Sequence, residues 1–454
     1  MSTTLALLVA LVGCKGDDTP VPEITAPVVD DGNVHDDLSM PQQPTLDPGD
    51  FESAQTCQFC HPSHYEEWRT SMHAYAMVDP VFQALVSVRQ QDLAGTEDQF
   101  CTQCHSAIGT RGGEIGNGFS FDELSPIVME GITCEACHKV TDIARDYNSG
   151  HVIDGKAPMQ GPISDPTASS FHESEGSPLF ESSEFCGACH DVIETSGLDL
   201  ERPYKEWLES PSAEEGQTCQ ECHMPLVERS PATGVAPRPV REHRWVGVDV
   251  PLLDGWVTEE EEDELKTRIS ELLETAADLD LSAPTSVAHG QTFDVTVTAT
   301  NKIAAHNLPT GSTFLRQLWV ELTATDANGT VLYVTGDLDA NGDLRDYWSE
   351  LDPYGDHDLP TLHSGFVDQH GNPTIFPWAA SEHNSNALSP LYDRTWTLFI
   401  PTDAAVASPI TVESRLRFRS IGPYVLRLVG MGDKVDEIDI HDLATDTVQV
   451  ELTP

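Results

Sequence analysis

The sequence has 454 residues and is strongly acidic, with 75 Asp and Glu against 24 Lys and Arg and a formal net charge of −51. A chain of this length forms more than one domain and has room for at least one buried core. Phosphate backbones are bound by basic surfaces, so this acidity argues against nucleic acid as a partner.

The first 14 residues have the pattern of an export signal. The apolar run at residues 5–12 is too short to cross a bilayer as a helix but suits the hydrophobic part of such a signal. The ending Leu11-Val12-Gly13-Cys14 resembles a bacterial lipobox, in which the Cys receives lipid. No Lys or Arg precedes the run, so the alternative is an unstructured N-terminus with one unpaired Cys. We predict lipidation of Cys14, a membrane partner through that lipid anchor, and a location in the periplasm or at the cell surface, with the outer membrane as the favoured membrane.

Three segments follow the signal in chain order. Residues 15–50 are rich in Asp, Pro, Val and Thr, a composition that buries no core, and we expect a flexible tether. Residues 51–257 contain all ten remaining cysteines and few long periodic segments, so this domain is expected to fold around something other than its own side chains. Residues 258–279 form the predicted connecting helix, because Thr258 and Glu261 make a capping box ahead of an apolar stripe.

Alternating apolar and polar residues predict strands in the last domain, 280–454. The pattern is clear at residues 293–300, 318–325, 330–335, 395–400, 410–418 and 447–452. Asn328-Gly329 between two of these runs is a hairpin signal. We predict an antiparallel β-sandwich here. The expected fold class is therefore multidomain, with a mainly α and irregular domain packed around prosthetic groups and followed by this sandwich.

The motif Cys-x-x-Cys-His occurs five times. Its members are Cys57/Cys60/His61, Cys101/Cys104/His105, Cys134/Cys137/His138, Cys186/Cys189/His190 and Cys219/Cys222/His223. Each motif is typical of c-type haem attachment, where two thiols form thioethers to the porphyrin and the adjacent His binds the iron. Zinc held by four thiolates is the rival interpretation, but it requires no His after the second Cys. We predict five covalently bound haems, numbered here by motif from 1 to 5.

The ligand on the second face of each iron separates an electron carrier from an enzyme, because an iron with two protein ligands has no vacancy for substrate. His73 is the nearest candidate. In a helical segment it would lie about 18 Å beyond His61 at about 1.5 Å per residue, so it is expected to bind a neighbouring iron. Residues 204–213 repeat the pattern of residues 65–74, with Ser212 in the place of His73. The Trp and Tyr of both copies are expected to pack against porphyrin faces.

Residues 51–250 resemble the multihaem cytochrome superfamily that includes tetrahaem carriers, hydroxylamine oxidoreductases and pentahaem nitrite reductases. The pattern CHxxxYxxWxxSxHA is complete at residues 60–74. The resemblance implies distal ligand roles for His73, for His172 and for His243, which follows Cys222-His223-Met224-Pro225. His306, in a loop that resembles one in β-rich domains of such cytochromes, is a further expected ligand, and His151 is the remaining candidate. None of the five motifs ends in Lys, which argues against ammonia-forming nitrite reduction.

Residues 337–343 have the opening of a calcium loop. Asp337, Asp339, Asn341 and Asp343 alternate as oxygen donors with Gly342 at the sixth position. The twelfth position is Trp348 where an acid is required, so a polar turn is the alternative.

These observations predict an exported pentahaem electron carrier with mostly bis-His haems and redox proteins as its partners. One alternative is a small-molecule oxidoreductase, acting on nitrogen or sulfur oxyanions at one five-coordinate haem. Another is a protein whose β domain docks a partner or assembles filaments. The acid-rich surroundings and paired imidazoles favour low potentials.

Overall fold

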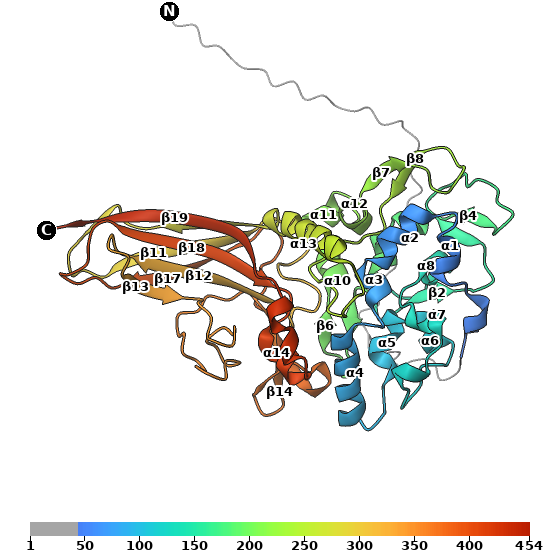
Figure 1. Ribbon diagram of the computed structural model, residues 1–454, viewed down its shortest axis with the longest axis horizontal. Helices are drawn as coiled ribbons and strands as arrows, with labels where there is room; N and C mark the ends of the chain where they lie inside the picture. Colours follow the sequence, from blue (N-terminus) through green and yellow to red (C-terminus); the bar gives the residue numbers. More distant parts are fainter. Residues whose placement is uncertain (1–43) are drawn as a thin grey trace, which may run out of the picture. The chain divides into compact units, whose positions relative to one another are not determined.

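The computed structural model describes residues 44–454, which all belong to one compact unit. The predicted export signal with Cys14, and most of the predicted tether, lie outside the described residues. Figure 1 shows the order of the elements in this unit.

The part of the chain before residue 258 consists of short helices joined by turns (Figure 1, blue to green). Pro starts α2, α4, α7, α10 and α11, where its fixed φ suits the first helical position and its missing N–H costs nothing. The helices are α1 (Ala54–Cys57), α2 (Pro62–Arg69), α3 (Met72–Tyr75), α4 (Pro80–Asp92), α5 (Gln99–His105), α6 (Ala107–Arg111), α7 (Pro126–Met129), α8 (Cys134–His138), α9 (Ser183–Gly187), α10 (Pro203–Leu208), α11 (Pro211–Glu214) and α12 (Cys219–His223), with 3₁₀ turns at Pro48–Asp50, Phe121–Glu123 and Pro178–Glu181.

Eight short strands in this region form two-stranded pairs that the sequence pattern did not predict. Strands β1 and β2, β5 and β6, and β7 and β8 pair antiparallel, whereas β3 and β4 pair parallel. Their bounds are β1 (Val140–Ile143), β2 (His151–Ile153), β3 (Met159–Gly161), β4 (Ser174–Gly176), β5 (Val192–Ile193), β6 (Asp199–Glu201), β7 (Leu226–Arg229) and β8 (Arg238–Arg241). Runs of two to four residues are too short to show a period of two.

The connecting helix predicted over residues 258–279 is present as α13 (Glu259–Glu274), but residues 277–279 lie instead at the start of strand β9 (Ala277–Ser282). Thr258 is its N-cap, and both bonds of the predicted capping box with Glu261 are present. Ile269 and Leu273 on its apolar stripe are buried against the core of the β region. The helix therefore begins for a local reason and is held by packing.

Residues 277–454 form the β region, whose strands lie mainly in two sheets. One sheet has the order β10-β19-β18-β12-β13 and the other β17-β11-β9. A smaller sheet has the order β15-β14-β16. The strands are β9 (Ala277–Ser282), β10 (Ser286–Ala288), β11 (Phe293–Asn301), β12 (Gln317–Thr325), β13 (Val331–Thr335), β14 (Gly365–Asp368), β15 (Pro373–Thr374), β16 (Ala380–Asn384), β17 (Asp393–Ile400), β18 (Ile410–Arg419) and β19 (His441–Thr453).

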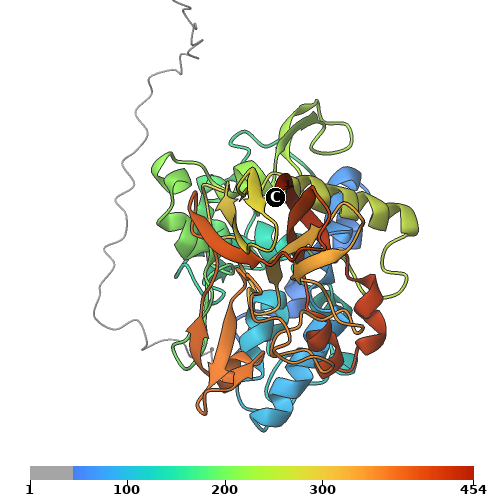
Figure 2. The same ribbon diagram turned by 90° about the vertical axis from the view of Figure 1, so that its left-hand side faces the viewer.

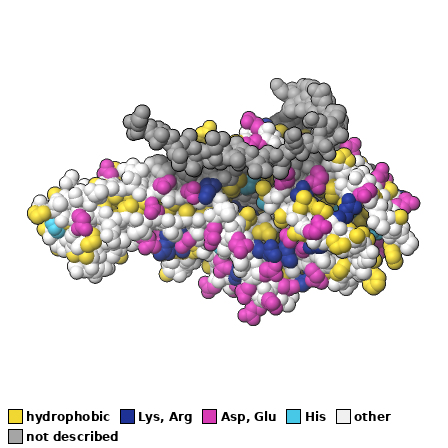
Figure 3. Space-filling view, turned by 90° about the horizontal axis from the view of Figure 1, so that it is seen from above, with side chains coloured by type: hydrophobic (Ala, Val, Ile, Leu, Met, Phe, Trp, Pro, Cys, Tyr) yellow, Lys and Arg dark blue, Asp and Glu magenta, His cyan; other side chains and the backbone are white. Residues whose placement is uncertain are grey.

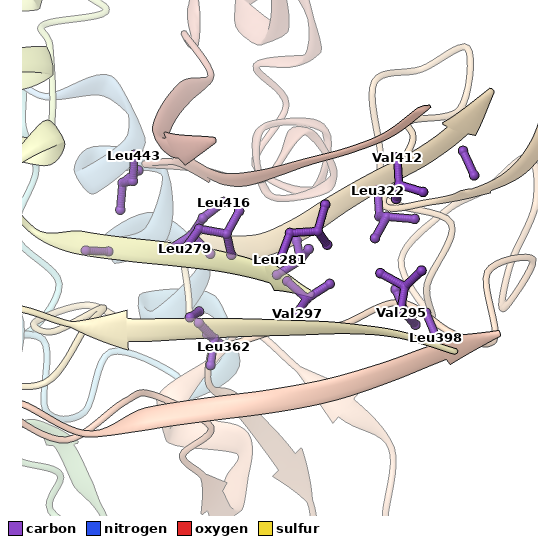
Figure 4. Packing of buried hydrophobic residues seen from close by; sticks show 14 of the residues in the cluster. Leu279, Leu281, Val295, Val297, Leu322, Leu362, Leu398, Val412, Leu416 and Leu443 are labelled. Carbon is purple, nitrogen blue, oxygen red and sulfur yellow. The ribbon is translucent and has the colours of Figure 1, made fainter. Parts of the chain in front are cut away.

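The two main sheets contribute to one apolar core. Figure 4 shows Leu281 and Val297 of the smaller main sheet turned toward Leu322 and Leu416 of the larger one. Alternate residues of β9, β11 and β18 are buried, which is the predicted period of two. Figure 2 views these strands from the end that carries the C-terminus.

All six predicted strands are confirmed, and the hairpin joining β12 to β13 carries Gly329 at φ +82°. The pairing of β10 with β19 is parallel, an exception to the antiparallel prediction. Helix α14 (Pro423–Leu428) and a 3₁₀ segment at Gly432–Glu437 follow β18, and another 3₁₀ turn lies at Pro377–Ala379. No helix in residues 44–454 has the length and apolarity to span a bilayer. Figure 3 shows acidic side chains spread over one face of the molecule.

Candidate metal centres

A single cavity of about 2200 Å³ runs through the helical region. Its walls contain all ten cysteines of the five motifs and all ten histidines predicted as ligands. Ordinary small-molecule pockets measure about 300–1,000 Å³, so this space is larger than one such ligand needs. The ten cysteines form no disulfide.

Motifs 2, 3 and 5 lie wholly on the short helices α5, α8 and α12, whereas α1 and α9 contain only the first Cys of motifs 1 and 4. In α8 and α12, the two Cys and the His stand at positions i, i+3 and i+4, which share one helix face. A capping box between Thr218 and Glu221 fixes the start of α12, because it satisfies two backbone N–H groups at the helix end. These two helices therefore present two thiols and one imidazole together.

Hydrogen bonds fix the orientation of four proximal imidazoles. Nδ1 of His61 lies 2.8 Å from the carbonyl oxygen of Pro231, and Nδ1 of His105 lies 3.0 Å from that of Ala76. The equivalent partners are Gln160 for His138 at 2.6 Å and Val246 for His223 at 3.3 Å. An Nδ1 that faces a carbonyl donates its proton, so Nε2 carries the free lone pair that a metal needs.

Four proximal imidazoles each face one predicted distal histidine. The ring centres are 6.2 Å apart for His61 and His172, 6.2 Å for His190 and His73, 6.1 Å for His138 and His243, and 6.4 Å for His223 and His306. A metal–imidazole bond is about 2 Å long, so two imidazoles on opposite sides of one metal place their ring centres roughly 6 Å apart. The four spacings fit a six-coordinate iron between each pair.

Hydrogen bonds also orient two of the distal rings. Nδ1 of His243 donates to the carbonyl oxygen of Arg241 at 3.0 Å, and Nδ1 of His306 donates to that of Asn307 at 2.9 Å. Both histidines therefore offer Nε2 as the ligand atom.

Burial favours the neutral form, which is the form that ligates metals, in five of the eight paired imidazoles. Burial lowers the pKa of His73 to about 3, and the nearby His190 lowers it further in the same direction. Burial followed by the charge of His306 lowers the pKa of His223 to about 4. Burial also lowers the pKa values of His138, His243 and His306. Neutral imidazole is the ligating species, so these sites suit iron near pH 7.

His105 and His151 do not join the paired set. The ring of His105 stacks on Phe82 with centres 3.8 Å apart and an angle of 3° between the planes, and no described histidine ring faces it at the spacing of the other pairs. His151 donates from Nε2 to the carbonyl oxygen of Phe185 at 2.8 Å, and its Nδ1 lies 3.6 Å from Sγ of Cys189. The free lone pair of His151 is therefore on Nδ1.

His64 is a cavity residue that sequence reasoning missed. Its ring makes edge contacts with His61 at 6.1 Å and His243 at 4.9 Å between centres. Burial lowers its pKa to about 4, and the charge of Arg229 adds to this effect. Its place three residues after a proximal His was the available signal, because both then lie near one helix face.

In the predicted calcium loop, several of the expected oxygen ligands are engaged by other groups of the protein. Asp343 pairs with Arg427 and Asp337 with Arg345, while Asp339 accepts the backbone N–H of Asn341 at 2.8 Å. No group of three or more His, Cys, Asp or Glu side chains in residues 44–454 is arranged to hold a metal ion by itself. Calcium binding stays a prediction.

Comparisons with known proteins agree with this chemistry. A family model described as cytochrome c554 and c-prime matches residues 56–139. Cytochrome c-554 of Nitrosomonas europaea (strain ATCC 19718 / CIP 103999 / KCTC 2705 / NBRC 14298) is 26% identical over 146 residues, which are 31% of this chain and 57% of that protein. The chain thus spans a little over half the length of this curated relative.

The crystal structure of a penta-heme cytochrome c552 from Thermochromatium tepidum has a similar fold. The TM-score is 0.62 at 20% identity, over 88% of this chain and 99% of that chain. Together with the five motifs and the cavity that they line, the two sequence matches support a multihaem c-type cytochrome with covalently bound haem c, and the structural match shows a similar fold.

Proposed function

We propose that this protein is an exported pentahaem cytochrome that transfers electrons through closely packed, mostly bis-His haems. The observation that carries the proposal is the set of four imidazole pairs with ring centres 6.1–6.4 Å apart, each joining one motif to a distant histidine. Iron bound on both sides by protein changes oxidation state without binding substrate, which is the property of a carrier.

The cysteines of each motif would hold one haem by thioethers, and the paired histidines would ligate its iron. Haem iron supplies one-electron chemistry between its ferric and ferrous states. The protein's part is to keep the imidazoles neutral and oriented, as in His138 and His243, whose pKa values are lowered and whose Nδ1 atoms are hydrogen-bonded.

Contacts between thiols of different motifs support an order of the haem sites. The thiols of Cys57 in motif 1 and Cys134 in motif 3 shift each other's pKa, so they lie near one another. Cys104 of motif 2 and Cys189 of motif 4 are in similar contact, as are Cys186 of motif 4 and Cys219 of motif 5. Cys137 of motif 3 interacts electrostatically with Cys189. We infer a continuous path from site 1 through sites 3 and 4, with branches from site 4 to sites 2 and 5.

Site 2 favours a second candidate function. Its proximal His105 has no histidine facing it at the spacing of the other four pairs. His151 remains the proposed distal ligand there, through Nδ1, but that atom lies beside Cys189 of motif 4. An iron left five-coordinate at site 2 has room for a small molecule, so the alternative is an oxidoreductase acting on nitrogen or sulfur oxyanions.

The remaining features of the proposal rest on the sequence and on the fold. Redox proteins are the proposed partners, and the periplasm or cell surface, with a lipid anchor on Cys14, is the proposed location. The two sheets around one core support a β-sandwich. The β region supplies His306 to site 5, and its role in docking or filament assembly remains an alternative to electron transfer alone.

Spectra of the purified oxidised protein test the proposal. The pyridine haemochrome assay is expected to give five haems per chain. Electron paramagnetic resonance is expected to show four low-spin bis-His irons. A low-spin fifth iron favours the carrier with His151 as a ligand, whereas a high-spin fifth iron that binds nitric oxide or cyanide favours the oxidoreductase. Two or more high-spin irons would contradict the assigned pairs.

A further inference from the structure

The two copies of the internal repeat share a glutamate that the ligand pattern does not use. Glu67 precedes Trp68 in α2, and Glu206 precedes Trp207 in α10. Glu67 is 3% exposed although it is ionisable, and Glu206 is partly buried. A buried carboxylate is retained only where it has strong partners.

Both glutamates accept a backbone N–H from a segment that carries a distal histidine. Oε2 of Glu67 lies 2.9 Å from the backbone nitrogen of His243 itself. Oε2 of Glu206 lies 3.1 Å from the backbone nitrogen of Asn307, the residue after His306. The two segments are 176 and 101 residues away from their glutamates in sequence, so the likeness does not come from local chain geometry.

The tryptophans of the repeat make an equally parallel pair of contacts. Nε1 of Trp68 donates to the carbonyl oxygen of Ile132 at 2.8 Å, and Nε1 of Trp207 donates to that of Gln217 at 2.9 Å. Each acceptor stands two residues before the first Cys of a motif, Cys134 of motif 3 and Cys219 of motif 5.

Each copy therefore holds both sides of one haem site. The first copy binds the attachment segment of motif 3 through Trp68 and the segment of its distal ligand through Glu67. The second copy does the same for motif 5 through Trp207 and Glu206. The second copy has Ser212 in the place of His73. This difference leaves the arrangement unchanged, because His73 faces His190 of motif 4 and takes no part in the contacts of Glu67 or Trp68.

The carboxylates are themselves fixed in different ways. Glu67 forms a two-pronged ion pair with Arg229, one prong measuring 2.7 Å. Glu206 accepts from Oγ1 of Thr310 at 2.5 Å, which ties it to the same loop as His306. Hydrogen bonds to an ionised acceptor are stronger than neutral ones, so each glutamate is a firm anchor for its segment.

We propose that Glu67 and Glu206 are positioning residues that hold the distal imidazoles of His243 and His306 against the irons of sites 3 and 5. The inference rests on the ligand pairs of the proposed function. Neither glutamate touches the metal. Each fixes the backbone from which the ligand projects, as outer partners of metal ligands commonly do.

The test compares Glu206→Ala and Glu206→Gln in the full-length protein with its haems attached. Glu206→Ala is expected to release His306 and to add a high-spin signal of about one haem in five, with a matching gain in carbon monoxide bound per chain. Glu206→Gln keeps an acceptor oxygen and is expected to restore the low-spin spectrum. Glu209→Ala, one residue beyond α10 with a side chain 65% exposed, is the matched control and is expected to match wild type.

Three further variants guard against misfolding and separate this proposal from the function on which it rests. Thr310→Val removes one hydrogen bond to Glu206 and is expected to give a smaller high-spin gain than Glu206→Ala. If neither Glu206→Ala nor Thr310→Val raises the high-spin fraction, the positioning role is overturned. Glu67→Ala is expected to act in the same way on site 3. If His306→Ala creates a high-spin iron but Glu206→Ala does not, only the positioning role fails. If His306→Ala leaves all irons low-spin, the assigned ligand pair fails.

Discussion

The two halves of the described chain are stabilised by different means. The β region has one core of 27 buried apolar residues shared by two sheets and α13, whereas the largest cluster formed only by residues before 258 has six. Residues before 258 also form most of the walls of the cavity of about 2200 Å³. Burial of apolar surface is the main favourable term in folding. The β region thus carries its own core, while the helical region relies on its haems for one.

The largest effect is expected when haem attachment is prevented. With all ten motif cysteines replaced by serine, the cavity has nothing to fill it, so residues 51–257 should lose ordered structure. Hydrogen exchange measured by mass spectrometry should show fast exchange there and slow exchange in β11, β12 and β18. Equally slow hydrogen exchange in both regions would contradict the view that the helical region depends on its haems and the β region does not.

A substitution in the β core should destabilise that region alone. Leu322→Ala removes a fully buried side chain and is expected to cost about 2–5 kcal/mol of unfolding free energy. Chemical denaturation followed by tryptophan fluorescence measures the change. Val331→Ala in the neighbouring strand β13, where the side chain is 57% exposed, is the control and should cost far less.

A change at one ligand should alter one site and leave both regions folded. His73 follows motif 1 in the sequence, but its imidazole faces His190 of motif 4. His73→Ala removes this imidazole, so about one haem in five should become high-spin. Electron paramagnetic resonance measures this fraction. The exposed His370→Ala is the control, and an unchanged low-spin count in His73→Ala would break the pairing of His73 with His190.

The smallest effect concerns pH and the β region. Burial raises the pKa of Asp346 to about 6, with further raising by Asp343. A raised folded pKa means that folding favours the protonated acid, so ionisation destabilises the protein as pH rises from about 4 through about 6. Asp346→Asn should therefore gain melting temperature over wild type at pH 7 but not at pH 4. A constant difference across this range would contradict the assignment.

The sequence predicted what depends on local pattern. The strands of the β region alternate because one face of each is buried, and α13 starts at Thr258 because its cap is local. The five motifs predict the attachment sites for the same reason, because their spacing is local. The predicted helical segment around His73 was interrupted, since α2 ends at Arg69 and α3 begins at Met72.

The pairing of the histidines depends on the whole fold. His61 meets His172 and His138 meets His243 across more than 100 residues, and no spacing rule reports such contacts. The roles of Glu67 and Glu206 were also invisible, although the repeat aligned them. The similarity appears only in the structure, where each glutamate accepts a backbone N–H from a segment that carries a proposed distal histidine.

The position of His306 in the chain has a consequence for biogenesis. Translation proceeds from the N-terminus, and 82 residues, including all of α13, lie between His223 and His306, the imidazole that faces it. Four of the five sites have their proposed ligands within the first 243 residues, apart from the undecided partner of His105. The proposed distal ligand of site 5 is present only in a chain that extends past residue 306, so a chain truncated before that residue is expected to show one high-spin haem.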